Sequence, residues 1–144
     1  MRTKTNHLPT ILLAEDQEET LKAILAFLEE SFRERYEVIG SVRDGIALVN
    51  ETLKLEPDVA VVDISMPKLN GIDAASELNE RKCSSKIVIL TIHSEPAFVR
   101  AAMNAGALGY VLKSRVFSDL PLAVDAALRG ERFTSPPLEN RVSD

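Results

Sequence analysis

Short apolar runs alternate with longer amphipathic stretches through most of the chain. The short runs are rich in β-branched residues, which is typical of strands. The longer stretches repeat apolar residues at helical spacing, which is typical of helices with one buried face. The pattern predicts strands at residues 10–14, 38–42, 59–62, 86–91 and 108–113, and helices at residues 18–30, 45–55, 72–81, 94–105 and 118–130.

Strands that alternate with helices across short connections imply right-handed βαβ crossovers. The expected fold class is therefore α/β. It is a flavodoxin-like, doubly wound (βα)5 three-layer sandwich with a five-stranded parallel sheet in the order 2-1-3-4-5. Residues 59–62 are apolar without alternation, as expected for a central strand that helices cover on both faces.

One domain is expected, at residues 10–130. Residues 1–9 are predicted to be a disordered or extended lead-in. Residues 131–144 hold two adjacent prolines and no apolar periodicity, so they are predicted to be a linker or a loose tail.

Several predicted helices begin with capping chemistry. Asp44 is expected to cap the second helix. Ser94, just before Pro96, predicts the start of the fourth helix. Ser118, with Pro121 in the first turn, predicts the start of the fifth.

The composition excludes several classes of function. A net charge of −5 and a pI of about 5.1 give the chain no overall attraction for DNA or for an anionic membrane. No apolar run approaches the ~18 residues that span a bilayer, and the N-terminus lacks the apolar region of a signal peptide. The single cysteine, Cys83, excludes a disulfide within the chain and fits a reducing cytoplasm.

Polar residues follow four of the predicted strands. They are Glu15 and Asp16 after the first, Asp63 after the third, Thr91 at the end of the fourth and Lys113 at the end of the fifth. In the expected order, the ends of strands one and three meet where such sheets bind their ligands. Asp63 alone has two interpretations: a site carboxylate, or an ordinary strand-end acid that caps a helix or pairs with a lysine.

Three carboxylates in one cleft would repel one another and require a cation. Mg²⁺ suits such an oxygen-only site, and Lys113 would add a fixed positive charge. A carboxylate in this setting can attack phosphorus and form an aspartyl phosphate, while the cations neutralise charge on the transferring group. Thr91 would offer its hydroxyl to a phosphoryl oxygen.

Taken together, five sequence marks resemble the receiver domains of two-component response regulators. They are Ala14-Glu15-Asp16, Val61-Val62-Asp63-Ile64-Ser65-Met66-Pro67, Asn70-Gly71, Leu90-Thr91 and Gly109-Tyr110-Val111-Leu112-Lys113. The resemblance covers roughly residues 10–130 and implies that Asp63 accepts a phosphoryl group from a sensor histidine kinase. Such a domain is a signalling phospho-acceptor rather than an enzyme, and it catalyses only its own phosphorylation and dephosphorylation.

The resemblance also implies a metal site and a switch. Mg²⁺ (or Mn²⁺) would be bound directly by Asp16, Asp63 and the backbone carbonyl of Ser65, with Glu15 acting through water. Thr91 and Tyr110 resemble the switch pair of the family, in which the hydroxyl moves toward the phosphate and the aromatic ring swings inward on phosphorylation.

Two features depart from the common pattern or modify it. Ser114 follows Lys113 where many receivers have a proline joined by a cis bond, and a cis bond before serine would cost about 2.5–4 kcal/mol. Ser65 and His93 flank the expected route of water to the phosphoryl group, so both are expected to tune the rate of dephosphorylation. The alternative for His93 is a rim histidine with no direct catalytic role.

Residues 109–114 and 127–136 are most similar to the NarL/LuxR-type subgroup, whose members carry a C-terminal helix-turn-helix that binds DNA. Only 14 residues follow Gly130, so DNA would be bound only through an output domain absent from this chain. The alternative is a stand-alone receiver that acts by protein contact. A homodimer formed on phosphorylation is compatible with the sequence, through helix four, strand five and helix five or through helices one and five.

Other classes fit less well. Haloacid-dehalogenase-like phosphohydrolases also use a strand-end Asp nucleophile, but they need a second acid two residues on, where this chain has Ser65. A dinucleotide-binding module would need glycines in the first strand–helix turn, which reads Ala-Glu-Asp-Gln-Glu-Glu. A degenerate receiver is disfavoured because every active-site position is filled.

Overall fold

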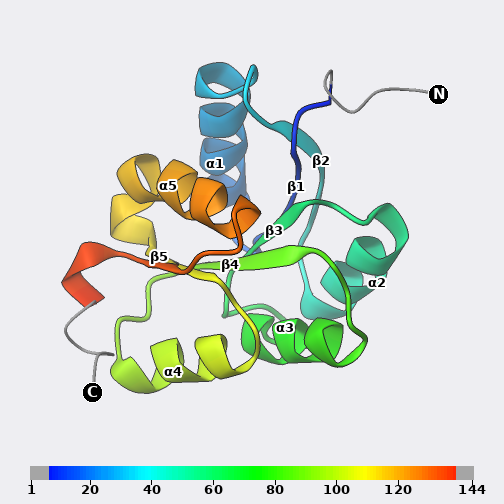
Figure 1. The fold of residues 1–144 in the computed structure, drawn as a ribbon, viewed down its shortest axis with the longest axis vertical. Helices are drawn as coiled ribbons and strands as arrows, with labels where there is room; N and C mark the ends of the chain where they lie inside the picture. Colours follow the sequence, from blue (N-terminus) through cyan, green and yellow to red (C-terminus); the bar gives the residue numbers. More distant parts are fainter. Residues whose placement is uncertain (1–6, 139–144) are drawn as a thin grey trace.

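The computed structural model describes residues 7–138, which form a parallel sheet between two layers of helices (Figure 1). The strands are β1 (Thr10–Ala14), β2 (Glu37–Val42), β3 (Val59–Val62), β4 (Lys86–Thr91), β5 (Gly109–Leu112) and β6 (Phe133–Thr134). Their order is β2-β1-β3-β4-β5-β6, so the predicted order 2-1-3-4-5 is confirmed. A short sixth strand, which the sequence did not predict, extends the sheet beyond β5.

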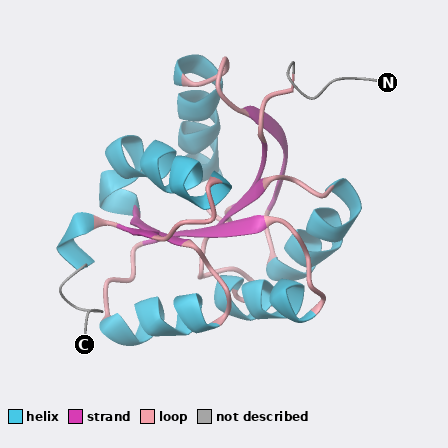
Figure 2. Cartoon of the chain, in the orientation of Figure 1, coloured by secondary structure: helices cyan, strands magenta, loops and turns pink. Residues whose placement is uncertain are grey.

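Five α-helices cover the sheet within these residues. They are α1 (Glu18–Ser31), α2 (Gly45–Leu55), α3 (Gly71–Glu80), α4 (Pro96–Asn104) and α5 (Val116–Leu128). Helices α1 and α5 cover one face, and α2, α3 and α4 cover the other (Figures 1 and 2). Every residue of β3 is fully buried because both faces of this central strand are covered. The predicted three-layer α/β architecture is confirmed.

The start of α2 agrees with its predicted cap, whereas the start of α4 does not. The Asp44 side chain accepts a hydrogen bond of 2.7 Å from the Ala47 N–H. The predicted cap at Ser94 is wrong by one position, because Glu95 immediately precedes α4 and Pro96 fills the first helical position.

The start of α5 was also predicted wrongly. The helix begins at Val116 rather than at Ser118, behind a short 3₁₀ turn, η1 (Lys113–Arg115), and Pro121 lies inside it. Val116 is buried in the cluster beneath α1 and α5, so tertiary packing extends the helix past its capping signal. The Ser118 hydroxyl donates to the Arg115 carbonyl instead of capping the helix.

The described part of the predicted C-terminal linker is folded against the domain, so that prediction is wrong for these residues. Phe133–Thr134 pair with β5, and Pro136–Leu138 form a second 3₁₀ turn, η2. Ser135 and Leu138 are fully buried. Residues 1–6 of the lead-in predicted at residues 1–9 lie outside the described residues, and so do residues 139–144 of the predicted tail.

Between residues 7 and 138, none of the helices combines the length and the apolar character that crossing a membrane requires.

Candidate functional site

The pairing of β1 with β3 sets acidic residues side by side at the carboxyl edge of the sheet. Ala14 is paired with Val62, and the Asp63 N–H donates to the Ala14 carbonyl over 3.0 Å. Glu15 and the residue after it therefore leave β1 at the level where Asp63 leaves β3. The side chains of Glu15 and Asp63 are only 1% and 5% exposed, so both carboxylates need nearby positive charge.

The start of α3 holds the backbone of Asp63 in place. A Cβ added at Gly71 would lie 2.1 Å from the Asp63 carbonyl oxygen, so only glycine fits this contact. The Gly71 N–H donates to the Ile64 carbonyl over 2.8 Å, and Asn70 caps the helix by accepting from the Asp73 N–H. The loop after β3 is thus closed tightly on itself.

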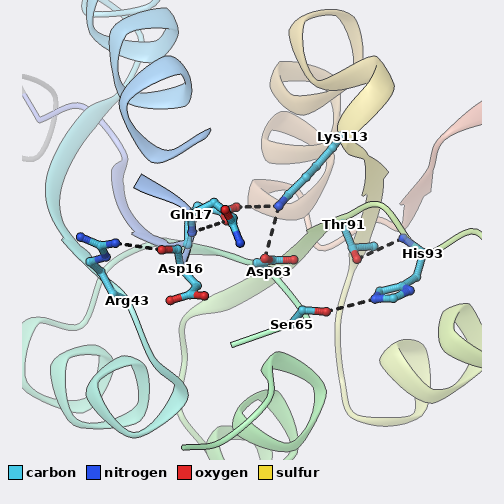
Figure 3. A network of polar contacts seen from close by, with 9 residues as sticks. Asp16, Gln17, Arg43, Asp63, Ser65, Thr91, His93 and Lys113 are labelled. Atoms are coloured by element: carbon cyan, nitrogen blue, oxygen red, sulfur yellow. Dashed lines mark hydrogen bonds and ion pairs between the residues drawn. The ribbon is translucent and has the colours of Figure 1, made fainter. Parts of the chain in front are cut away.

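Lys113, which follows β5, supplies the positive charge (Figure 3). Its Nζ lies 3.3 Å from Asp63 Oδ2 and 3.0 Å from Glu15 Oε1. The second contact lacks the geometry of a hydrogen bond, and Glu15 Oε1 is buried with no other partner. One ammonium therefore forms ion pairs with two buried carboxylates, and it leaves Glu15 Oε1 without a hydrogen bond.

The electrostatics of Glu15 reflect this crowding. Burial and the neighbouring Asp63 charge raise the pKa of Glu15 by more than the Gln17 N–H and Lys113 lower it. The Gln17 N–H donates to Glu15 Oε2 over 3.0 Å. A second cation at this edge would relieve the remaining repulsion.

The donor atoms at the edge fit a hard divalent cation. Asp16, Asp63 and the Ser65 carbonyl offer oxygens only, and Mg²⁺ is commonly held by one or two carboxylates together with retained waters. Across residues 7–138, no three acidic, histidine or cysteine side chains form a group that could hold a metal by themselves. The backbone carbonyl and water would thus have to complete the coordination, and Glu15 Oε1, which accepts no hydrogen bond, suits a role through water. The metal assignment stays a prediction.

The segment after β4 builds a chain of contacts around His93. The His93 N–H donates to Thr91 Oγ1 over 3.2 Å, and the His93 carbonyl accepts from the Tyr110 hydroxyl over 2.7 Å. The ring Nε2 lies 3.1 Å from Ser65 Oγ (Figure 3), and the ring stacks on Phe98 with centroids 4.4 Å apart. His93 therefore joins the loop after β3 to the end of β4 and to Tyr110 of β5.

Tyr110 is fully buried, so its ring already occupies the inward position that the resemblance implies for the switched state. Burial, together with the negative charge of Glu95, raises the pKa of the Tyr110 phenol above its ordinary value. The hydroxyl is consequently protonated and donates to the His93 carbonyl.

The loop after Lys113 has no cis peptide, and none occurs elsewhere in the described residues. Lys113 itself begins the η1 turn, so the chain enters α5 through a 3₁₀ turn.

The structure brings most of the predicted site residues together. Glu15, Asp63 and Lys113 are in direct contact, whereas Thr91 is joined to His93. The sequence placed His93 beside Ser65 as a residue that tunes dephosphorylation, with a rim histidine as the alternative, but gave no sign that His93 also links Thr91 to Tyr110. It also missed a second buried network, centred on Asp119 and Ser135, because neither residue lies in a recognisable motif.

The acidic edge, the paired lysine and the sheet order define a receiver-type signalling domain. The sequence model of the response regulator receiver domain matches residues 11–125, and the chain belongs to this family. Members of the family are signalling proteins rather than enzymes in the ordinary sense.

Curated relatives agree with this assignment. An uncharacterized transcriptional regulatory protein of Bacillus subtilis (strain 168), YvfU, is 39% identical over 128 residues, which are 89% of this chain and 63% of YvfU. DesR, a transcriptional regulatory protein of the same organism, is 36% identical over 129 residues, which are 90% of this chain and 63% of DesR. The chain thus spans less than two thirds of the length of these relatives.

Solved structures extend the agreement to the subgroup. A LuxR-family two-component response regulator from Aurantimonas sp. SI85-9A1 superimposes with a TM-score of 0.88 at 28% identity, covering 95% of this chain and 96% of that one. The isolated receiver domain of RcsB from Salmonella enterica serovar Typhimurium, solved with phosphomimetic BeF₃⁻, has a TM-score of 0.83 at 28% identity, covering 95% and 100%. The predicted similarity to the NarL/LuxR-type subgroup is confirmed.

Proposed function

We propose that this chain is a phosphorylation-activated receiver in which Asp63 accepts a phosphoryl group from a sensor histidine kinase. The observation that carries the proposal is the position of Asp63. Its buried carboxylate lies at the carboxyl end of the central strand, 3.3 Å from the Lys113 ammonium. This is the edge at which open α/β sheets bind their ligands, and membership of the receiver family supports the assignment.

In the transfer, a carboxylate oxygen of Asp63 attacks the phosphorus of a phosphohistidine. The new O–P bond forms as the N–P bond breaks, and the histidine nitrogen leaves with the electron pair of that bond and takes up a proton from solvent. Lys113 binds a phosphoryl oxygen and neutralises its charge. Because the ammonium already contacts the acceptor carboxylate, this charge is in place before the donor arrives.

A divalent cation, Mg²⁺ or Mn²⁺, would be held by Asp16, Asp63 and the Ser65 carbonyl, with Glu15 acting through water. When bound, it would supply further charge neutralisation on the phosphoryl oxygens. Arg43 donates to the Asp16 carbonyl over 3.0 Å and so fixes the backbone that presents this carboxylate.

The switch would run through His93. When the Thr91 hydroxyl turns toward the phosphoryl group, it gives up the bond from the His93 N–H, and the carbonyl of the same residue holds the Tyr110 hydroxyl. A change at Thr91 thus reaches Tyr110 through one intervening residue. The contact between Ser65 and the His93 ring flanks the site, and we propose that these two side chains tune dephosphorylation.

The output is proposed from the relatives. They are transcriptional regulatory proteins of which this chain spans only part, so we propose transcriptional control through a C-terminal helix-turn-helix. The alternative is a stand-alone receiver that acts by protein contact. Exposed Phe117 and Leu122 on α5 are available to a homodimer through α1 and α5 or through α4, β5 and α5.

The proposal is tested by intact mass after incubation with acetyl phosphate and Mg²⁺. A single phosphoryl adduct is expected on the wild type and on Asp58→Asn, but not on Asp63→Asn, and EDTA should prevent it. Asp58 is the matched control because it lies at the opposite end of β3, where it accepts from the Thr10 N–H. An adduct that persists on Asp63→Asn would place the acceptor elsewhere, and no adduct on the wild type would contradict transfer from small donors.

A further inference from the structure

The C-terminal segment, residues 133–138, lies along the edge of the sheet beside the proposed switch residue. Phe133 and Thr134 pair in parallel with Gly109 and Tyr110 of β5. The segment then turns through η2 toward α4 (Figure 1). The segment therefore covers part of the β5 edge, where a change in the position of Tyr110 would be felt first.

Ser135 joins this segment to β5 and α5 through three hydrogen bonds. Its N–H donates to the Tyr110 carbonyl over 3.0 Å, and its hydroxyl oxygen accepts from the Leu112 N–H over 3.1 Å. The same hydroxyl donates to Asp119 Oδ2 over 2.8 Å. Ser135 is 0% exposed and Asp119 is 2% exposed, so these bonds are shielded from water.

Leu138 anchors the end of the segment by apolar packing. It is 0% exposed and belongs to the same buried cluster as the Tyr110 ring and the α4 residues Val99 and Ala102. The segment is consequently bonded to the Tyr110 backbone at Ser135, and at Leu138 it shares one buried cluster with the Tyr110 ring.

We propose that docking of the C-terminal segment and the inward position of Tyr110 stabilise each other, so that the segment carries the state of the site to whatever follows residue 138. This inference rests on the proposed function. If the ring left the cluster, Leu138 would lose part of its packing and the segment would loosen. Conversely, a segment that detaches would leave a gap beside the ring and weaken its inward position. The two effects are reciprocal because they share one free energy of coupling.

The coupling predicts two effects that can each be measured. Phosphorylation, by favouring inward Tyr110, should tighten the segment, and removal of the Leu138 side chain should weaken binding of a phosphoryl mimic. The mimic is beryllofluoride with Mg²⁺, which adds no covalent step. Hydrogen exchange reports the first effect at the Ser135 and Leu112 amides, because both donate hydrogen bonds that join the docked segment to β5.

The test compares the wild type, Leu138→Ala and Leu55→Ala in exchange and in beryllofluoride titration. Leu55 is the matched control because it is a leucine that is 39% exposed at the end of α2, outside both proposed dimer faces. In the wild type we expect saturating beryllofluoride to slow exchange of the Ser135 amide about tenfold. In Leu138→Ala we expect faster exchange there without the mimic and about tenfold weaker beryllofluoride binding, with neither change in Leu55→Ala.

Two outcomes would overturn the inference, and they are distinguishable. Suppose that acetyl phosphate labels Asp63, but the mimic does not slow exchange at the Ser135 amide and Leu138→Ala does not weaken binding of the mimic. The segment is then uncoupled from the site, and only this inference fails. If Asp63 is not labelled and beryllofluoride does not bind, the proposed function fails and this inference fails with it. Ser135→Ala provides a second variant, since it removes the hydroxyl bonds without altering the apolar cluster.

Discussion

At the scale of single residues, the acidic edge combines two buried carboxylates with one ammonium. Asp63→Asn removes one of these carboxylates and leaves Lys113 3.0 Å from Glu15. We expect the free energy of unfolding to rise by about 1 kcal/mol in metal-free buffer, because the repulsion that helps to raise the pKa of Glu15 disappears. Mg²⁺ should stabilise the wild type more than the variant. Urea unfolding with and without Mg²⁺ measures both effects.

Asp58→Asn at the other end of β3 is the control, and it should respond to Mg²⁺ as the wild type does. A lower stability of Asp63→Asn in metal-free buffer would mean that the attraction between Lys113 and Asp63 exceeds the repulsion between the carboxylates.

A second residue-scale prediction concerns Asp119. Burial alone would raise the pKa of this carboxyl, but hydrogen bonds from Arg115, Ser135 and Ser118 outweigh burial and lower it below the ordinary 3.8. A carboxyl with a lowered folded-state pKa contributes stability above its unfolded pKa and loses that contribution as the pH falls through the folded value. The stability difference between the wild type and Asp119→Asn should therefore be constant from pH 8 to about pH 5 and shrink below about pH 4.

Urea unfolding of both proteins at several pH values checks this expectation. Asp73→Asn, at an exposed carboxyl on α3, is the control. A difference that stays constant down to pH 3 would mean that Asp119 is not held ionised by its three donors.

The role of a residue could be predicted from the sequence only where that role follows from its position along the chain. Asp63 and Lys113 could be predicted because each lies at the end of an apolar strand, where parallel sheets gather their functional groups. The connection between Ser65 and His93 spans 28 residues and depends on how two loops pack, so no local pattern indicates it. The same holds for the hydrogen bond between Asp119 and Ser135. It depends on the pairing of β6 with β5, and no pattern in the sequence predicts β6.

At the scale of elements, the junction between β3 and α3 determines the position of the acceptor. Gly71→Ala would force a Cβ into a contact of 2.1 Å with the Asp63 carbonyl oxygen, so the loop must shift. We expect a loss of stability of about 1–3 kcal/mol and a phosphorylation rate by acetyl phosphate that falls at least tenfold. Thermal unfolding and the rate of adduct formation measure the two effects.

Gly40→Ala in β2 is the matched control, because an added Cβ there would meet Leu12 at an ordinary 3.4 Å. Phosphorylation should be unchanged in this variant. Normal phosphorylation of Gly71→Ala would show that the loop can move without displacing Asp63.

Element boundaries were predictable where a local signal and the tertiary packing agree. Asp44 caps α2 as expected because its backbone is extended and its side chain accepts from the Ala47 N–H. At α5 the capping signal of Ser118 conflicted with the burial of Val116, and packing prevailed. The two-residue strand β6 has no periodicity of its own and forms only because β5 offers an open edge.

At the scale of the whole molecule, the alternating pattern was sufficient for the architecture. A parallel sheet with both faces covered needs continuous apolar strands and amphipathic helices, and the sequence displays both directly. What the pattern could not supply was the limit of the domain. Prolines and a lack of periodicity after Gly130 are typical of linkers, yet Ser135 and Leu138 complete the core at the edge of the sheet.

The folded limit of the domain can therefore be tested by truncation. A chain that ends at Gly130 loses the buried Leu138 side chain, worth about 1.5–3 kcal/mol, and the bonds that Ser135 makes with Tyr110 and Leu112, worth about 0.5–1.5 kcal/mol each. The entropy of ordering six residues offsets part of this sum. We expect residues 1–130 to be less stable than residues 1–138 by about 1–3 kcal/mol in urea unfolding.

Because the truncated chain also exposes the cluster around Tyr110, its denaturant slope should decrease together with its midpoint. Equal midpoints would mean that the segment rests on the edge of the sheet without contributing to the stability of the domain.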